Sequence, residues 1–273
     1  MIDIQNISFG YDRKKAKVVD GFSLHLEQNC IYGLLGLTGM GKSTSLYLLT
    51  GVLRPEDGCI LVDGMDTRKR KTEMLQQMYI VPETFELPRM RFMDFVETYR
   101  PFYPGFSMEV LEWCMEEFQL PLTCNIQELS MGEKKTVMMS FALATGTRYL
   151  LMDEPTNGLD LPSKRQFRRV IASNMNEERT IVIATHQLHD VEQLLDHVLI
   201  LKDSRLLLNR SVAELSDKYS FGLLPMGLAD EDIVYAERNV QGDVGIWLRQ
   251  ADDAETSVEL ETLFNAAVQG KLN

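Results

Sequence analysis

A phosphate-binding loop between an apolar strand and a helix constrains this chain more than any other feature. Residues 36–44 read Gly-Leu-Thr-Gly-Met-Gly-Lys-Ser-Thr, after the apolar run 30–35 and before a helical pattern that begins near Lys42. The loop glycines allow successive backbone N–H groups to turn toward phosphate oxygens, where side chains would collide with the ligand. Strand, loop and helix in this order predict a site for a nucleoside triphosphate, and they disfavour a glycine-rich turn that precedes Lys-Ser by chance.

The loop residues take distinct roles in such a site. Lys42 is expected to reach the outer phosphates and to act in catalysis, and the Ser43 hydroxyl is placed to ligate Mg²⁺. The helix N-terminus adds partial positive charge at the same place. The residues of the loop that are expected to bind the nucleotide are Gly36, Leu37, Thr38, Gly39, Met40, Gly41, Lys42, Ser43 and Thr44.

A second apolar run, residues 149–153, ends in two adjacent carboxylates. A phosphate-loop enzyme needs an acid beside the loop to hold Mg²⁺ together with the loop hydroxyl, and Asp153 fits that role. Glu154 follows it and is the better candidate to orient or deprotonate the attacking water. The alternative is a strand that ends in an ordinary acidic turn, and the intact phosphate loop makes this less plausible.

His186 follows a third core strand, predicted at residues 180–185. It is therefore expected to point into the crevice where open α/β sheets bind ligands. There it could donate a hydrogen bond to the terminal phosphate, or hold Glu154 and the water in line. A lone histidine at such a position is more often a capping or packed residue, but the loop and the acids favour a catalytic role.

Charge limits the classes of partner. The net charge of −12 disfavours a chain that coats nucleic acid, because phosphate backbones are bound by clustered Lys and Arg. The one basic run, residues 68–71, is short and is followed by Glu73, so we interpret it as the solvated start of a helix. No nucleic-acid partner is expected.

Cysteine usage and hydropathy indicate the compartment. Cys30, Cys59, Cys114 and Cys124 show no paired metal-ligand spacing, which is typical of free thiols in a reducing compartment. Asp3 interrupts the first apolar residues, and no stretch of about 18 apolar residues occurs. We expect a cytoplasmic protein whose membrane association depends on a partner.

Short apolar runs alternate with helical patterns, which predicts an α/β fold with a sheet flanked by helices. Strands are expected at residues 2–7, 23–26, 30–35, 59–62, 78–81, 149–153, 180–185 and 198–201. Helices are expected after the phosphate loop and at residues 161–174 and 189–195.

Two stretches depart from this alternation. Aromatic residues followed by apolar residues at helical spacing predict a helical insertion at about 87–145, with the aromatic side chains as its core. Beyond residue 216, the runs 232–240 and 244–250 flank Gln-Gly-Asp, a hairpin signal, and 258–268 is helical. The predicted division is a large domain at 1–215 and a small α+β appendage at 216–273.

In their order along the chain, these landmarks resemble the ATP-binding subunit of an ABC transporter over residues 1–215. Residues 36–44 match the phosphate loop of that family, and Asp153 and Glu154 match its metal-binding and catalytic acids. Residues 129–133, Leu-Ser-Met-Gly-Glu, lie where the family carries its signature Leu-Ser-Gly-Gly-Gln, and we call them the signature segment.

Three further positions carry the resemblance. Asn-Gly-Leu-Asp at residues 157–160 resembles the loop that crosses between protomers, and His186 resembles the switch histidine. Tyr11 matches the aromatic residue that stacks on adenine, with a core tyrosine as the alternative reading. The implied fold is the P-loop NTPase fold of ABC ATPases, with an N-terminal antiparallel β region and a helical insertion.

The resemblance implies an ATPase that works as a head-to-tail dimer with ATP and Mg²⁺. Each ATP would lie between one phosphate loop and the other protomer's signature segment, where Ser130, Gly132 and Glu133 bind in trans and Asp160 lies at the crossing loop. The partners implied are a membrane permease and a second copy or a related ATPase subunit. The chain would then lie on the cytoplasmic face of the membrane, and the helical insertion would pass its motion to the permease.

The chain departs from the family pattern at two places. Glu83 stands where the family usually has a glutamine that touches Mg²⁺, so the ligating oxygen is kept and the amide donor is lost. A third acid near Asp153 and Glu154 is expected to raise the pKa of one of them unless Mg²⁺ is bound. Met131 and Glu133 alter the signature segment, but Ser130 and Gly132 remain, so we expect activity with an altered rate.

Within the family, residues 99–106 and 260–264 resemble subunits of simple exporters that use a separate permease. The appendage would then regulate, dimerise or cap the sheet. Two other readings stay open. One is an ABC-type ATPase that acts on the ribosome or nucleic acid. The other is a nucleotide-gated regulatory module with weak hydrolysis, which the altered positions suggest.

Overall fold

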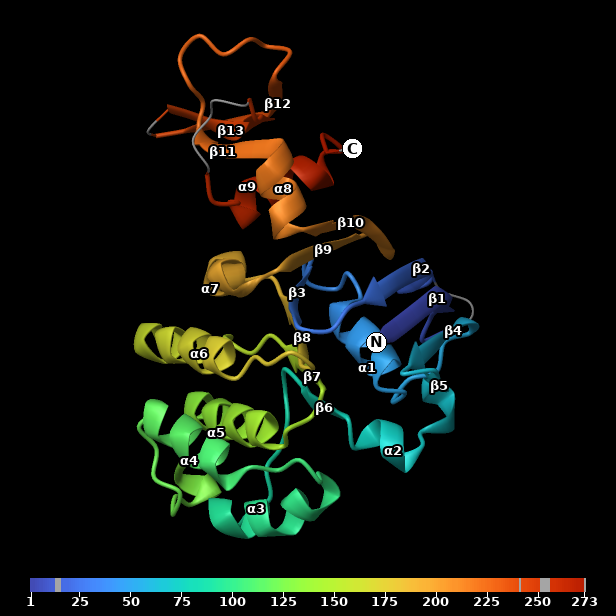
Figure 1. Ribbon diagram of the computed structural model, residues 1–273, viewed down its shortest axis with the longest axis vertical. Coiled ribbons are helices and arrows are strands. Elements are labelled where there is room, and N and C mark those ends of the chain that lie inside the picture. Colours follow the sequence, from blue (N-terminus) through green and yellow to red (C-terminus); the bar gives the residue numbers. More distant parts are fainter. Residues whose placement is uncertain (13–15, 241, 251–255, 273) are drawn as a thin grey trace.

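A six-stranded sheet forms the centre of the molecule (Figure 1). The computed structural model describes residues 1–12, 16–240, 242–250 and 256–272. The strand order is β10-β9-β3-β8-β7-β6. These strands are β3 (Cys30–Leu35), β6 (Met78–Val81), β7 (Tyr149–Asp153), β8 (Thr180–Thr185), β9 (His197–Lys202) and β10 (Arg205–Ser211).

Five of the six central strands run parallel, since β3 pairs with β8 and β9, and β7 pairs with β6 and β8. Only β10 is antiparallel to its neighbour β9. The parallel strands are mostly apolar because helices or a second sheet cover both faces, whereas β10 is largely polar and exposed. The carboxyl ends of β3, β7 and β8 meet at one edge, so the segments that follow them meet there as well.

An antiparallel sheet of order β2-β1-β4-β5 and the helix α1 (Lys42–Leu49) cover one face of the central sheet. Its strands are β1 (Ile2–Phe9), β2 (Val19–Leu26), β4 (Asp57–Val62) and β5 (Met65–Asp66). The predicted N-terminal antiparallel region is therefore present. The basic run 68–71 is exposed and lies at the end of the 3-10 turn η1 (Thr67–Lys69) and in the two residues before α2 (Thr72–Leu75).

The other face carries α5 (Met131–Ala144) and α6 (Leu161–Ser173). The helix expected at 189–195 is shorter, because α7 (Leu188–Val191) gives way to the 3-10 turn η4 (Glu192–Leu194). The segment α7–η4 follows His186 directly. It therefore begins close to the carboxyl end of β8.

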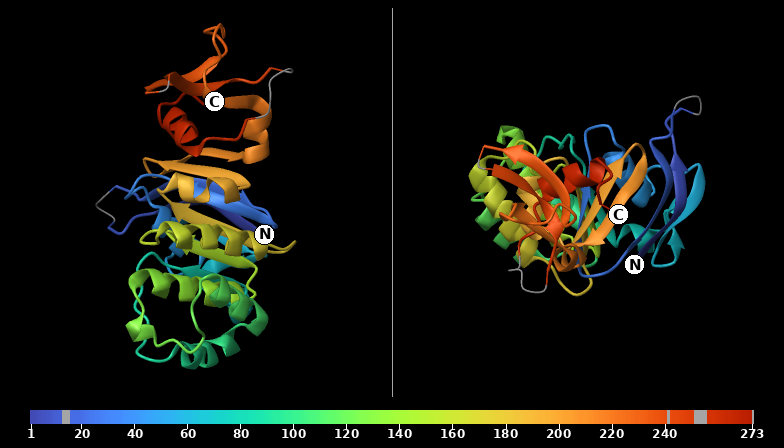
Figure 2. Two further views of the ribbon diagram at one scale, coloured as in Figure 1. Left: turned by 90° about the vertical axis from the view of Figure 1, so that its left-hand side faces the viewer. Right: turned by 90° about the horizontal axis from the view of Figure 1, so that it is seen from above.

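The helical insertion lies at one end of the molecule, far from the appendage at the other end (Figures 1 and 2). It comprises α3 (Phe92–Tyr99), η2 (Arg100–Phe102), α4 (Met108–Glu117), η3 (Ile126–Glu128) and α5. Its core is aromatic, as the sequence predicted: the rings of Phe95 and Phe141 meet edge to face at 5.1 Å. Phe102 is an exception, with 62% of its surface exposed.

The appendage is a three-stranded sheet backed by helices. It comprises α8 (Val212–Lys218), β11 (Tyr219–Leu223), β12 (Ile233–Asn239), β13 (Gly242–Leu248) and α9 (Leu260–Val268). The hairpin β12–β13 is formed where Gln-Gly-Asp predicted it, although residue 241 lies outside the described residues. The predicted division at residue 216 falls within α8 and stays a prediction.

The C-terminal helix α9 packs on the segment α7–η4 that follows His186. The Glu192 carboxylate accepts a hydrogen bond of 2.7 Å from the Leu260 backbone N–H, and His189 Nε2 lies 3.0 Å from the Glu261 carboxylate. Apolar residues of the appendage and of the central sheet belong to one continuous hydrophobic cluster. The appendage therefore shares its core with the rest of the chain.

Candidate active site

The phosphate-binding loop connects β3 to α1 at the ligand-binding edge of the central sheet. Gly39 (φ +84°) and Gly41 (φ +90°) adopt left-handed backbone conformations that favour glycine. A Cβ on Gly36 would approach the Leu201 carbonyl oxygen to 3.0 Å, so a larger residue there would crowd that backbone. No side chain caps the N-terminus of α1, and its first N–H groups are available to an anion.

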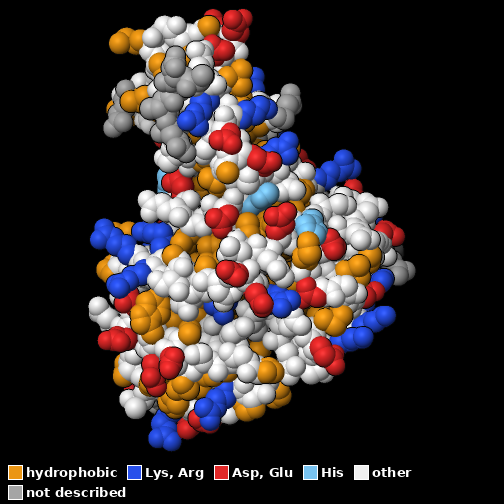
Figure 3. Space-filling view, viewed as in Figure 1, with side chains coloured by type: hydrophobic (Ala, Val, Ile, Leu, Met, Phe, Trp, Pro, Cys, Tyr) orange, Lys and Arg blue, Asp and Glu red, His pale blue; other side chains and the backbone are white. Residues whose placement is uncertain are grey.

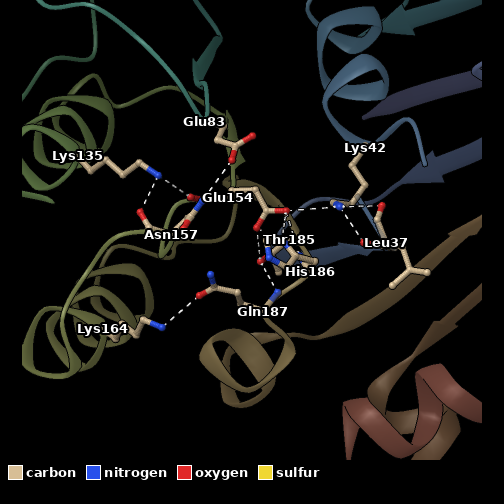
Figure 4. Close-up of polar contacts among 11 residues, drawn as sticks. Leu37, Lys42, Glu83, Lys135, Glu154, Asn157, Lys164, Thr185, His186 and Gln187 are labelled. Atoms are coloured by element: carbon tan, nitrogen blue, oxygen red, sulfur yellow. Dashed lines mark hydrogen bonds and ion pairs between the residues drawn. The ribbon is translucent and has the colours of Figure 1, made fainter. Parts of the chain in front are cut away.

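Lys42 is buried at the mouth of this loop (Figure 4). Its ammonium donates to the Gly36 carbonyl at 2.7 Å and to the Leu37 carbonyl at 3.3 Å. It also lies 3.4 Å from the Glu154 carboxylate. The charge is therefore held between the loop backbone and the strand β7, where the outer phosphates of a nucleotide would enter.

Glu154 receives an unusually complete set of donors for a carboxylate. Thr185 Oγ1 donates to it at 2.8 Å, the His186 backbone N–H at 3.1 Å, and His186 Nδ1 lies 2.8 Å away. Burial would raise the pKa of Glu154, but these contacts and the charge of Lys42 outweigh it and hold that pKa below its usual range. Glu154 is thus an oriented carboxylate whose ionised form is favoured.

The pKa of the neighbouring Asp153 is shifted in the opposite direction to that of Glu154. Burial raises the pKa of Asp153, and the negative charges of Glu83 and Glu154 raise it further, while a hydrogen bond from Ser43 lowers it. The rise expected from crowding the acids therefore falls on Asp153. Its Oδ1 is buried and has no hydrogen-bond partner among the described residues.

These oxygens fit Mg²⁺. The buried, unpartnered oxygen of Asp153 and the Ser43 hydroxyl are hard ligands of the kind that this ion prefers. No group of three or more His, Cys, Asp and Glu side chains suited to a metal occurs in the described part of the chain. In nucleotide sites Mg²⁺ takes its remaining ligands from phosphates and water.

A pocket of about 290 Å³ unites most of the sequence-predicted residues. Its lining comprises Tyr11, Val18, Thr38, Gly39, Gly41, Lys42, Ser43, Thr44, Glu83, Glu154 and His186. Of the other loop residues, Gly36 packs on Leu201, Met40 joins the core, and Leu37 faces the neighbouring pocket toward α9. The sequence analysis did not predict Val18 as a lining residue, because its place depends on tertiary packing. A Cβ on Gly41 would approach the Val18 carbonyl oxygen to 2.7 Å.

Tyr11 lies at the open side of this pocket with 66% of its surface exposed. Its hydroxyl is 3.1 Å from Thr44 Oγ1, and its ring meets Phe9 edge-on with centroids 5.0 Å apart. An exposed, anchored ring beside the phosphate loop disfavours the reading as a core tyrosine. Its contact with adenine stays a prediction.

The signature segment lies apart from the pocket of about 290 Å³, which we call the Lys42 pocket. Ser130 caps α5: its hydroxyl accepts from the Glu133 N–H at 3.2 Å, and the Glu133 carboxylate accepts from the Ser130 N–H at 2.8 Å. Ser130, Gly132 and Glu133 line a second pocket, of about 790 Å³, together with Asp160, whose carboxylate caps α6. One chain therefore does not bring these four residues to the phosphate loop.

Glu83 contacts the segment 157–160 that follows Glu154. The Asn157 side-chain amide donates to its carboxylate at 3.2 Å (Figure 4), and Glu83 lines the pocket that contains Lys42. Lys135, on α5, donates to backbone carbonyls of the same region, a contact that the sequence did not predict. Metal ligation by Glu83 stays a prediction.

None of the helices in the described part of the chain combines the length and the apolar run that crossing a bilayer requires.

Comparison with known proteins identifies the family. A sequence model of the ABC transporter family matches residues 19–157. The ABC transporter ATP-binding protein YtrB of Bacillus subtilis (strain 168) is 28% identical over 220 residues, covering 80% of this chain and 75% of that protein. The putative ABC transporter ATP-binding protein PH0132 of Pyrococcus horikoshii is 30% identical over 256 residues, covering 90% and 94%.

Solved structures show the same fold. The dimeric structure of a post-hydrolysis state of the ATP-binding cassette MJ0796, bound to ADP and Pi, aligns with a TM-score of 0.68 and 21% identity. The alignment covers 77% of this chain and 98% of that chain. On its fold, its phosphate loop and these relatives, the chain belongs to the ABC transporter family, as one of its ATP-binding subunits.

Proposed function

We propose that this chain hydrolyses ATP as one half of a head-to-tail pair and energises transport through a separate membrane permease. One observation carries the proposal: the groups that would bind and attack the nucleotide line one pocket, and the signature segment lines another. A second chain, turned end to end, would bring its signature segment over the phosphate loop of the first. The cassette MJ0796, which has this fold, is dimeric in its ADP and Pi complex.

Within one site, different groups of the chain would bind the triphosphate, the adenine, the attacking water and Mg²⁺. The phosphate loop and Lys42 would bind the triphosphate, and Tyr11 would stack on the adenine. Glu154 would accept the proton of the attacking water, while Thr185 and His186 keep its carboxylate in one orientation. Mg²⁺, held by Asp153 and Ser43 with Glu83 nearby, would neutralise charge on the phosphoryl oxygens.

The partner chain would complete the site. Its Ser130 hydroxyl and the N–H groups at the start of α5 would face the terminal phosphate, where a helix N-terminus favours negative charge. Asp160 would lie at the crossing between the two chains. Glu133 supports this arrangement indirectly, because its carboxylate fixes the backbone of Ser130.

The helical insertion is the proposed permease contact. Phe102 and Tyr99 are exposed there although the remaining aromatic residues are packed, and Figure 3 shows hydrophobic side chains at the surface around this end of the molecule. Exposed apolar groups of this kind mark interaction surfaces. Bound in this way, the chain would lie on the cytoplasmic face of the membrane.

The function is tested by measuring phosphate release over a range of protein concentrations. A shared-site dimer gives a specific activity that rises with concentration below the dimerisation range, and a constant specific activity there would contradict it. Glu154→Gln is expected to lower the rate on the order of 100-fold or more, because the base is lost while the shape is kept.

The matched control is Glu177→Gln, which makes the same change at an exposed position outside the pocket. Its rate should equal that of the wild type. A Glu154→Gln variant that also retains the wild-type rate would rule out Glu154 as the base and would favour a regulatory module with weak hydrolysis. Co-purification of an integral membrane protein would test the proposed partner.

A further inference from the structure

A buried lysine outside the phosphate loop is bonded to the backbone of the catalytic segment. Lys135 lies near the start of α5, and only 7% of its surface is exposed. Its ammonium donates to the Glu154 carbonyl at 3.0 Å and to the Asn157 carbonyl at 2.8 Å (Figure 4). One side chain thus joins the helix of the signature segment to the end of β7 and to the crossing loop.

The backbone of Glu154 needs such support. Its φ of 45° lies in the left-handed region, which is unfavourable for a residue with a side chain and persists only where the surroundings enforce it. The Glu154 N–H donates to the Ala184 carbonyl at 2.8 Å, and the Glu154 carbonyl accepts from Lys135. These two bonds hold both sides of the residue, so the direction of its side chain depends on them.

The buried ammonium of Lys135 lies among carboxylates. Burial of an ammonium is costly, and a neutral side chain would fill the same space more cheaply if packing were its only role. Burial lowers the pKa of Lys135, and the carboxylates of Glu83, Glu154 and Asp153 attract the ammonium and offset part of that cost. The contact of Glu83 with the Asn157 side chain closes a network that returns to Lys135 through the Asn157 carbonyl.

We infer that Lys135 is a positioning residue for hydrolysis: it holds the Glu154 backbone in its productive conformation and offsets the negative charge that Glu83 adds to the site. This inference rests on the proposed role of Glu154 as the base. Lys135 does not line the Lys42 pocket, so its effect is on the rate of hydrolysis rather than on ATP binding.

The test compares Lys135→Met, which keeps the length but removes charge and donors, with Lys135→Arg, which keeps both. We expect Lys135→Met to lower kcat on the order of 30-fold, because misplacement of a catalytic group by about 1 Å costs up to 100-fold. KM for ATP should stay within about threefold, and Lys135→Arg should recover most of kcat. Lys69→Met, the same change at an exposed lysine of η1 outside both pockets, is the control and should leave kcat unchanged.

A double variant tests the charge relation. In the Lys135→Met background, Glu83→Gln removes the carboxylate that has lost its counter-charge, so it should raise kcat about fivefold, whereas purely additive effects would contradict the offset. If Lys135→Met does not fold, as judged by circular dichroism, Lys135→Gln replaces it with the same expected loss of kcat.

The outcomes separate this inference from the proposed function. A Lys135→Met enzyme with wild-type kcat, beside an inactive Glu154→Gln enzyme, would overturn only the role of Lys135. A rise in KM with kcat unchanged would also overturn it. A fully active Glu154→Gln enzyme would overturn the proposed function itself, and the role of Lys135 with it.

Discussion

The Lys42 pocket and the surface around the signature segment, here called the signature surface, would together make one ATP site. Their side chains are held in place in different ways. In the pocket, Glu154 is surrounded by donors from its own chain, and Lys42 is held by carbonyls of its own loop. At the signature surface, the capping box satisfies Ser130 and Glu133 locally, while Met131 and Leu161 nearby are 58% and 75% exposed. The first half is organised within the chain, and the second presents an exposed surface suited to a partner.

The largest effect should come from removing the charge of the pocket. Lys42→Met should weaken ATP binding on the order of 100-fold, since a charge-assisted contact to phosphate is lost. Fluorescent-nucleotide titration of the dilute protein measures this. Lys69→Met, at an exposed lysine of η1, is the control and should bind as the wild type does. Equal affinity of both variants would place the phosphates elsewhere.

A smaller and different effect should come from the signature surface. Ser130→Ala should lower the hydrolysis rate at saturating ATP about 10-fold, while the affinity of the dilute protein for ATP stays within about twofold. The lost helix cap should also cost about 1 kcal/mol of stability. Titration and phosphate release on the same samples separate the two readouts. A parallel loss of affinity in the dilute protein would mean that the two halves are not independent.

The smallest effect concerns pH. The folded-state pKa of Glu154 lies below its usual value of 4.5, so its contribution to stability is present above pH 4.5 and is lost as pH falls through the lowered value. The difference in melting temperature between wild type and Glu154→Gln should therefore shrink as the pH is lowered from 5 toward 3. A difference that grows on acidification would contradict the assigned direction of the shift.

Much of the fold could be predicted because the central strands are continuous apolar runs. The strands β3, β6, β7 and β8 have the predicted bounds, since each run ends at Gly, Pro, an acid or His. The sequence analysis missed β10, whose three consecutive leucines break the alternation typical of an edge strand. It also missed α8, although the Ser211–Glu214 capping box is a sequence signal.

The proximity of candidate site residues could be predicted where those residues come at the ends of neighbouring strands. Asp153, Glu154 and His186 meet because β7 and β8 are parallel neighbours whose ends share an edge. The positions of Lys135 and Val18 could not be predicted in this way. The first depends on how α5 docks against β7, and the second on a backbone approach to Gly41, neither of which leaves a local pattern.

The shared core of the appendage has a consequence for how the molecule melts. Leu260 and Leu263 of α9 belong to the same hydrophobic cluster as Val191 and Leu194, which follow His186. Cooperative unfolding units follow such continuous packing rather than lines drawn along the sequence. A chain cut after residue 215 would lose α9 and expose Val191 and Leu194 to water, in the segment that follows His186. Heat should accordingly disrupt the appendage and the catalytic edge of the sheet together.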